Sequence, residues 1–284
     1  GHVFRLELTD LLGQRLLVHP DERRHVMAHG VHRVVRLVAM DCPVAQMVGH
    51  ELIGAHGTHR DVDRNLGPLR RFRHPAAIGA RHLEIVAVHA SVVEFEGEEV
   101  IKVERDLEAL PFDIKKLGST VDEPTYVKLK GLNLENGVVE VKVLSRLQTP
   151  STFQGSQGFI GLAFRINEDN TAYESVYLRP RVGRSADQIA RNHTVQYYAY
   201  PDFKFDKLRE PEYRGQYETY ADIALDEWIT MRIEFQDKKA KLYLNDQEAP
   251  SFVVNELLGS TTSGSIALWV DIGTVGYFKD LKIK

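Results

Sequence analysis

The sequence predicts a mainly β protein: an antiparallel two-sheet jelly-roll sandwich over about residues 92–284, preceded by a separate N-terminal segment that is helix-prone or poorly specified. From residue 91, apolar and polar residues alternate with a period of two, as in strands with one buried face. Roughly a dozen such runs follow one another with almost no helical stretch between them, which is typical of a sandwich. The length of about 195 residues, twice that of an immunoglobulin domain, favours the larger jelly roll.

The N-terminal segment, residues 1–90, has a composition of its own. It contains eleven of the twelve histidines, twelve arginines and no lysine, and its net charge is +3 against −7 for the remainder. Phe4 and Phe72 are its only aromatic residues, so it has little large apolar surface to bury. Leucines within residues 11–17 suit one helical face, and Pro20 suits the start of a second helix. A small helical domain and a disordered or misassigned stretch, such as a GC-rich gene read in the wrong frame, both stay open.

The expected strands can be read in order from the alternation. In 159–166 the large apolar residues fall at every second position, and 228–235 and 240–246 repeat the pattern around an expected turn at Asp237-Lys238. A further strand-like run, Leu83 to Val88, leads into this part of the chain. The other expected strands are 99–104, 125–130, 138–147, 172–179, 194–200, 264–271 and 276–283.

Four consecutive stretches near the C-terminus form a recognisable series: W-x-x-M-x-I-E at 228–234, A-K-L-Y-L-N-D at 240–246, S-I-A-L-W-V at 265–270 and F-K-D-L-K-I at 278–283. With them, residues 92–284 resemble the concanavalin A-like lectin/glucanase superfamily, which includes laminin-G-like modules. The segment 173–203 resembles uncharacterised bacterial members. The resemblance implies a jelly roll and an extracellular or periplasmic location, although no signal peptide is visible. It does not imply one activity, since the superfamily mixes lectins, carbohydrate-binding modules, glycosidases and adhesion modules.

One sheet face is the candidate ligand-binding site. If Val176 and Leu178 point into the core, residues 173, 175, 177 and 179 share the opposite face. Aromatic rings cover the C–H faces of a sugar, and amide and guanidinium groups pair with its hydroxyls. The predicted ligand-binding residues on this concave face and the loop beside it are Tyr177, Arg179, Arg191, Gln196, Tyr198 and Trp269. The alternative is that these aromatic residues fill the space between the sheets.

The charged connection 181–193 is expected to be a long loop, and such loops are often functional. It holds His193, the only histidine after residue 90, which suits a general acid or base. The predicted catalytic residues of a sugar-cleaving enzyme are therefore Glu174 or Asp187 with His193. Glycoside hydrolysis needs a pair of carboxyl groups, and the further candidates are Glu218, Asp222 and Asp271. No E-x-D-x-x-E array is present, and strand parity places Glu174 away from residues 177 and 179 unless a bulge intervenes.

The predicted function is accordingly a carbohydrate-binding domain that recognises a glycan on a concave sheet face. The alternatives are a glycoside hydrolase or related sugar-cleaving enzyme, and a laminin-G-like protein-adhesion module. A pair of carboxyl groups in a pocket favours the enzyme, and an open aromatic shelf favours the binder. A flat apolar patch with a polar rim favours adhesion.

Several classes of function are excluded by composition. A net charge of −4 argues against a general nucleic-acid binder. No apolar run approaches the roughly 18 to 20 residues of a membrane span. The single cysteine, Cys42, forbids an intrachain disulfide and a cysteine-based zinc site.

No resident metal or other cofactor is expected. Histidines at 25, 29 and 32 share a helical face, and His50-Glu51 begins a zinc-protease pattern that fails because Gly54 stands where the second histidine is needed. Calcium is conceivable, since Asp122-Glu123 and Glu168-Asp169-Asn170 offer oxygen donors, but tight turns explain these residues as well.

Overall fold

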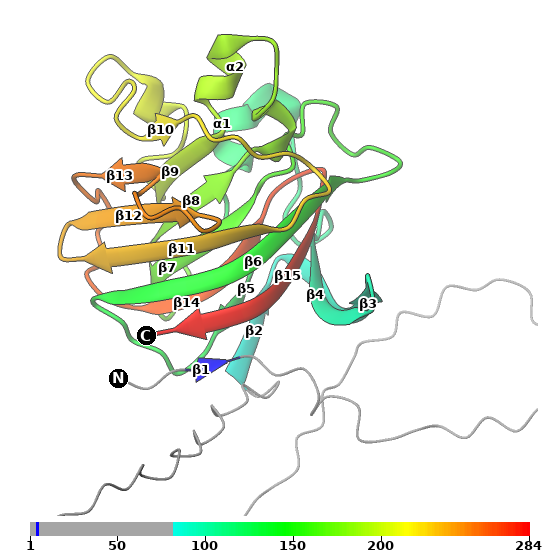
Figure 1. Cartoon of the computed structure of the whole chain (residues 1–284), viewed down its shortest axis with the longest axis horizontal. Helices are drawn as coiled ribbons and strands as arrows, with labels where there is room; N and C mark the ends of the chain where they lie inside the picture. The colour runs from blue at the N-terminus through cyan, green and yellow to red at the C-terminus, as the bar shows by residue number, and fades with distance from the viewer. Residues whose placement is uncertain (1–3, 6–81) are drawn as a thin grey trace, which may run out of the picture.

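The computed structural model describes residues 4–5 and 82–284, and these form two antiparallel sheets packed face to face (Figure 1). The expected helices of the N-terminal segment and its histidine spacings lie outside the described residues. The mainly β sandwich predicted from the alternation is confirmed.

The first sheet has the order β13-β12-β11-β6-β15-β4-β3, and β1 pairs with the end of β15. We call it the eight-stranded sheet. Its strands are β1 (Phe4–Arg5), β3 (Val88–Phe95), β4 (Glu98–Arg105), β6 (Gly137–Leu147), β11 (Ile229–Gln236), β12 (Lys239–Leu244), β13 (Phe252–Val254) and β15 (Thr274–Ile283).

The second, seven-stranded sheet has the order β10-β9-β8-β7-β14-β5-β2. Its strands are β2 (Leu83–Val86), β5 (Tyr126–Leu129), β7 (Ile160–Ile166), β8 (Tyr173–Leu178), β9 (Val195–Tyr200), β10 (Glu218–Thr219) and β14 (Ser265–Val270). β2 and β3 belong one to each sheet, so the sandwich includes residues 83–91, which lie before the expected start at about residue 92.

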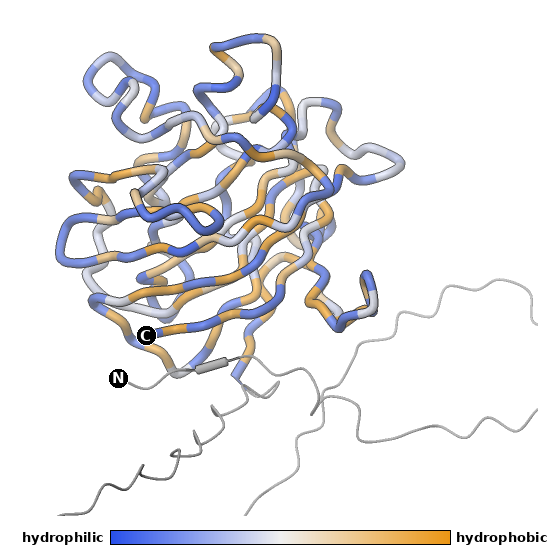
Figure 2. The backbone as a smooth tube through the Cα atoms, viewed as in Figure 1, coloured by the Kyte–Doolittle hydropathy of each residue, from blue (hydrophilic) through white to orange (hydrophobic). Residues whose placement is uncertain are grey.

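The core lies between the two sheets and is built from one face of each. The rings of Phe164 on β7 and Phe235 on β11 stack across it with centroids 4.9 Å apart. Alternation along β11 buries Ile229, Met231 and Ile233 and leaves the intervening side chains partly exposed. Figure 2 shows the same alternation as changes of hydropathy along the strands.

Short helices and long connections gather at one end of the sandwich, where Figure 1 shows α1, α2 and the β10 segment together. The helices are η3 (Ile114–Lys116), α1 (Leu117–Thr120), η4 (Pro180–Val182), α2 (Gln188–Asn192) and η5 (Lys207–Arg209). The connection expected to be one loop thus contains η4 and α2. None of the helices in the described ranges is both long enough and apolar enough to cross a membrane.

Candidate ligand cavity

Five aromatic side chains, which we call the aromatic array, lie on the outer face of the seven-stranded sheet: Tyr126, Tyr173, Tyr177, Tyr198 and Trp269. Strand register places them there, because Trp269, Gly161 and Tyr177 are successive cross-strand partners and such partners share a face. The Tyr177 and Trp269 ring centroids are 4.9 Å apart, and Tyr198 is 5.7 Å from each of them. Tyr173, Tyr177, Tyr198 and Trp269, which were expected on one sheet face, therefore lie together away from the inter-sheet core. Tyr126, which was not expected there, joins them as the cross-strand partner of Trp269.

Gly161 allows two of these rings to meet. It lies between Tyr177 and Trp269 on the middle strand of the three. A Cβ atom at this position would lie 2.6 Å from Tyr177 Cα and would also collide with the Val176 carbonyl oxygen. Only glycine therefore lets β7 and β8 approach as closely as they do.

The aromatic array is buried, because two chain segments cover it. Trp269 Nε1 donates to the carbonyl oxygen of Glu123 at 2.9 Å, and the Tyr173 hydroxyl donates to that of Asp122 at 3.3 Å. The backbone N–H of Phe205 donates to Asp122 Oδ2 at 2.9 Å, so residues 203–209 pack on the same segment. The face is thus not an open shelf, and Tyr177, itself only 1% exposed, is the member of the array that borders a cavity.

A cavity of about 260 Å³ remains between this cover, the sheet and α2. One part of its wall is apolar and aromatic, and the other part carries charged and amide groups. The lining residues are Leu117, Val121, Asp122, Phe153, Gly155, Gln157, Phe159, Tyr177, Arg179, Val182, Ala190, His193, Phe205, Arg209 and Asp271. Three predicted site residues, at 177, 179 and 193, therefore meet in one wall.

Asp122 and Asp271 are two buried carboxyl groups in that wall. Asp271 Oδ1 accepts from Arg105 Nη1 at 2.6 Å, and Asp271 Oδ2 accepts from the backbone N–H of Asp122 at 2.9 Å. Burial, and then the neighbouring Asp271 carboxylate, raise the pKa of Asp122 to about 7. Asp122 also has a positive φ of 54°, a conformation that Asp and Asn tolerate better than most residues. The cavity therefore contains a carboxyl group that changes charge near neutral pH.

Arg179 is held rigidly beside the aromatic ring. Its Nη2 donates to the Tyr177 hydroxyl at 2.6 Å, and its Nη1 donates to the His193 carbonyl oxygen at 2.8 Å. Gln196 Oε1 lies 3.4 Å from both terminal nitrogens. Gln196 thus orients Arg179 and is absent from the cavity lining.

His193 and Arg209 share one acid at the other side of the wall. His193 Nδ1 is 2.6 Å and Arg209 Nε is 3.4 Å from Glu218 Oε2. Glu218, on β10, therefore positions both side chains against the cavity.

The remaining predicted residues lie apart from the cavity. Glu174 faces the opposite side of the seven-stranded sheet, where it pairs with Arg165 Nη1 at 3.4 Å and accepts from the Tyr197 hydroxyl. Asp187 caps α2 by accepting from the Ile189 N–H, and Arg191 donates to the Tyr220 hydroxyl. The structure therefore does not bring Glu174, Asp187 and His193 together.

Several lining residues had no signal in the sequence strong enough to select them. Phe153 and Phe205 come from irregular segments, where no periodicity shows which way a side chain points. Phe159 opens the expected strand 159–166, but nothing in the sequence distinguishes it from a structural aromatic residue. Asp122 was noted only as an oxygen donor and Asp271 only as one of several acids. Their burial depends on the packing of residues far apart in the chain.

Lysine ammonium groups occupy both segments that offered oxygen ligands to calcium. Lys128 Nζ donates to the carbonyl oxygens of Asn167 and Glu168 and to Asn170 Oδ1, at 2.9–3.0 Å, with Glu84 Oε2 at 3.4 Å. Lys204 pairs with Glu123 in the same manner. Within residues 82–284 there is no group of three or more acidic, histidine or cysteine side chains arranged to hold a metal ion.

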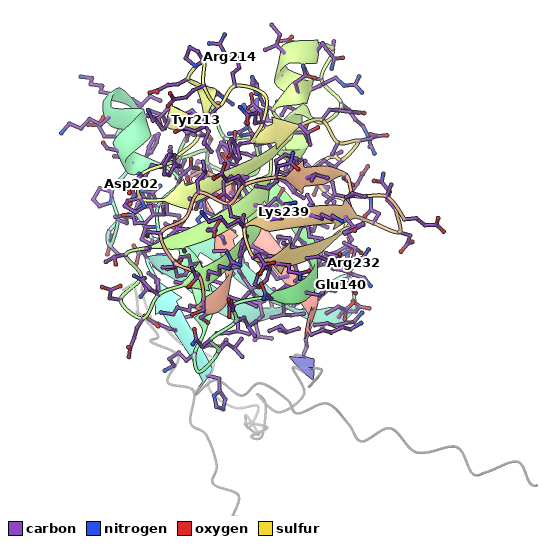
Figure 3. All side chains as sticks on the ribbon, turned by 90° about the vertical axis from the view of Figure 1, so that its left-hand side faces the viewer. Glu140, Asp202, Tyr213, Arg214, Arg232 and Lys239 are labelled. Atoms are coloured by element: carbon purple, nitrogen blue, oxygen red, sulfur yellow. The ribbon has the colours of Figure 1, made fainter. Side chains whose placement is uncertain are left out.

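The outer face of the eight-stranded sheet is charged. Figure 3 shows Arg232 on β11 beside Glu140 on β6, and the two are cross-strand partners. Lys282 Nζ donates to Glu140 Oε1 at 2.7 Å, and the guanidinium carbon of Arg232 lies 3.9 Å from the Tyr243 ring centroid. This face is a solvated one, in contrast to the covered face with the cavity.

Comparison with known proteins yields matches of structure only. No protein-family model and no curated protein sequence matches the chain. Among solved structures, the carbohydrate-binding module CBM66 from Bacillus subtilis has a TM-score of 0.43 at 9% identity, with 70% of this chain and 96% of that chain covered.

Two further solved structures are similar to this chain. Domain 4 of the GH43 extracellular arabinanase AbnA from Geobacillus stearothermophilus has a TM-score of 0.35 at 12% identity, covering 69% of this chain and 74% of that one. The exoplasmic/lumenal domain of VIP36 in its Ca²⁺/Man2-bound form has a TM-score of 0.38 at 8% identity, covering 73% and 83%. At these identities the similarity is one of fold, so the functional argument rests on the cavity.

Proposed function

We propose that this domain binds carbohydrate and that a single sugar residue enters the cavity beside Tyr177. The observation that carries the proposal is one wall in which aromatic rings and fixed charged groups meet. Rings suit the C–H face of a pyranose, while carboxylate, guanidinium and imidazole groups pair with its hydroxyls. Binding of polysaccharide outside the cytoplasm belongs to the same proposal, and cell fractionation of the source organism tests that location.

The size of the cavity supports one residue rather than a length of chain. Its volume of about 260 Å³ falls just below the range of roughly 300–1,000 Å³ for pockets that take drug-sized ligands. The polar groups of the wall are also fixed before a ligand binds. Arg179 donates a hydrogen bond to the Tyr177 hydroxyl, and Asp122 accepts one from the Phe205 N–H. Such preorganisation reduces the entropy lost when a ligand binds.

The experiment is a glycan array followed by isothermal titration calorimetry on the full chain and on a blocked variant. Ala190 on α2 lines the cavity, so Ala190→Trp fills it without removing a polar group. Ile189→Trp is the matched control, because Ile189 is 71% exposed and lies outside the lining. We expect Ala190→Trp to abolish binding and Ile189→Trp to retain it. Equal binding by the two variants would refute the cavity as the site.

Sugar cleavage is a second candidate, and one observation favours it. Asp122 and Asp271 lie in the same wall, and a carboxyl group with a pKa of about 7 can act as a general acid near neutral pH. In this form of the proposal Asp122, not Glu174, donates the proton. Release of reducing ends by the wild type and its loss in Asp122→Asn would support cleavage, and retention without release would exclude it.

The adhesion alternative has no comparable support. The exposed large apolar side chains of the described residues come from separate elements, including β2, β3, η3, α2 and β13.

A further inference from the structure

We propose that the sugar bound in the cavity is an acidic one, a uronic acid residue, and that Arg179 pairs with its carboxylate. This inference rests on the proposed function and names the class of sugar. It comes from a contrast among the buried arginines of the sandwich.

Three arginines are almost fully buried in residues 82–284: Arg105 and Arg165 at 3% exposure each and Arg179 at 5%. Arg105 pairs with Asp271 at 2.6 Å, and Arg165 pairs with Glu174 at 3.4 Å. Arg179 has no carboxylate within 4.0 Å in the described part of the chain, and its hydrogen bonds go to neutral oxygens. It is also the only one of the three that lines the cavity.

A buried charge without a counter-charge is costly. Arg179 carries this cost. Its guanidinium is oriented by Tyr177 and Gln196 and lines the cavity of about 260 Å³. A ligand carboxylate would supply the missing partner, and a guanidinium is well suited to it because its planar donors match the two oxygens.

Three of the other charged or titratable side chains that line the cavity have a partner of opposite charge within the protein. Asp271 is paired with Arg105, and both His193 and Arg209 contact Glu218. The exceptions are Arg179 and Asp122, which act on each other electrostatically but have no ion pair within 4.0 Å among the described residues. Burial raises the pKa of Asp122 to about 7, so below that pH it is neutral and the positive charge of Arg179 is left uncompensated. The wall then suits a monoanion.

The test is isothermal titration calorimetry of the full chain at pH 6 with matched pairs of sugars: D-glucuronate against D-glucose, and D-galacturonate against D-galactose. Acetate serves as the carboxylate without a sugar ring. We expect at least one uronate to bind roughly 10- to 100-fold more tightly than its neutral partner, as for a hydrogen bond between charged groups. Acetate should bind far more weakly than that uronate.

Two substitutions assign the preference to Arg179. Arg179→Gln should bring the affinities for uronate and neutral sugar together, and Arg179→Lys should keep part of the preference because it keeps the charge. Arg184→Gln is the matched control, since this exposed arginine pairs with Asp222 and Glu227 and lies outside the lining. It should retain the full preference.

Each contrary outcome has a distinct meaning. Neutral sugars that bind as well as uronates to the wild type would overturn this inference and leave the proposed function standing. Absence of any sugar binding would overturn both. A folded Arg179→Gln variant that keeps the preference would overturn the role of Arg179. If neither Arg179 variant folds, the comparison of sugars on the wild type still decides whether the ligand is acidic.

Discussion

The carboxyl group of Asp122 makes the stability of this domain depend on pH. Its pKa rises from an ordinary value of 3.8 to about 7, chiefly because the group is buried and secondly because Asp271 is nearby. A pKa raised by folding means that the folded state favours the protonated form. Protonated Asp122 therefore stabilises the folded state. This stabilisation is complete below about pH 4 and is lost as the pH rises to 7. At about 1.4 kcal/mol for each pH unit, the wild type loses about 4 kcal/mol of unfolding free energy over this range.

Asp122→Asn removes this dependence and little else. Asparagine has the same shape, accepts the hydrogen bond from the Phe205 N–H, and tolerates the positive φ of 54°. We therefore expect the variant to be more stable than the wild type at pH 8, by up to about 4 kcal/mol, with the difference shrinking as the pH falls toward 4.

Urea unfolding of the full chain at pH 4.5, 6 and 8, followed by tryptophan fluorescence, measures this difference. Trp269 is a suitable reporter because it contacts the segment that contains Asp122. Asp187→Asn is the control for loss of a carboxylate at an exposed helix cap, and it should change the stability by less than about 1 kcal/mol. Parallel pH profiles for the wild type and Asp122→Asn would refute the reasoning.

Four further predictions concern the array, the lysine-filled loop, the inter-sheet acid and the cavity. Gly161→Ala should lower the unfolding free energy by roughly 2–4 kcal/mol, since its methyl group collides with β8, and thermal unfolding measures the loss. Lys128→Met should cost about 3 kcal/mol in urea unfolding, because it leaves three oxygens without their common donor. Glu174→Gln should destabilise the fold by about 1–3 kcal/mol and leave sugar affinity within twofold in calorimetry, because Glu174 faces away from the cavity. Uronate affinity should rise roughly tenfold from pH 8 to pH 6 in the same assay, because Asp122 gains a proton and no longer repels the ligand carboxylate. The charged and titratable groups that act on Asp122 or contact its segment are Asp271, Arg179, Lys204, Tyr173, Tyr177 and Tyr198.

The outcomes that count against these predictions are equally specific. An unchanged melting temperature for Gly161→Ala would mean that β7 and β8 are farther apart than described. Full stability of Lys128→Met would mean that water replaces the ammonium without cost. A large loss of sugar affinity in Glu174→Gln would mean that Glu174 takes part in sugar binding after all. Uronate affinity that falls on acidification would contradict the assigned charge of Asp122.

The sequence was sufficient for most of the strands and for the face that most of their side chains take. The strands β3, β10 and β13 were not expected. The alternation also fails at Arg165, because an irregularity in the β7–β14 pairing turns this side chain to the face of Glu174. The period of two in residues 172–179 depends on neighbours along the strand, and it correctly placed Tyr177 and Arg179 together and Glu174 on the other face. The cover over that face was not predictable. It forms by contact of residues near 122 with residues near 205, through a bond such as Phe205 N–H to Asp122 Oδ2, and no local pattern encodes such packing. For the same reason the sequence predicts an open aromatic shelf where the structure has a covered array, of which one ring, Tyr177, borders the cavity.

The ammonium group of Lys128 has a consequence for the conditions in which the domain keeps its shape. A bound divalent ion leaves its loop when its free concentration falls below the dissociation constant or when a chelator competes for it. The cation between β5 and residues 167–170 is covalently attached to the chain, so its local concentration does not depend on the medium. We therefore expect this loop to keep the same conformation in a chelating buffer as in a medium rich in calcium.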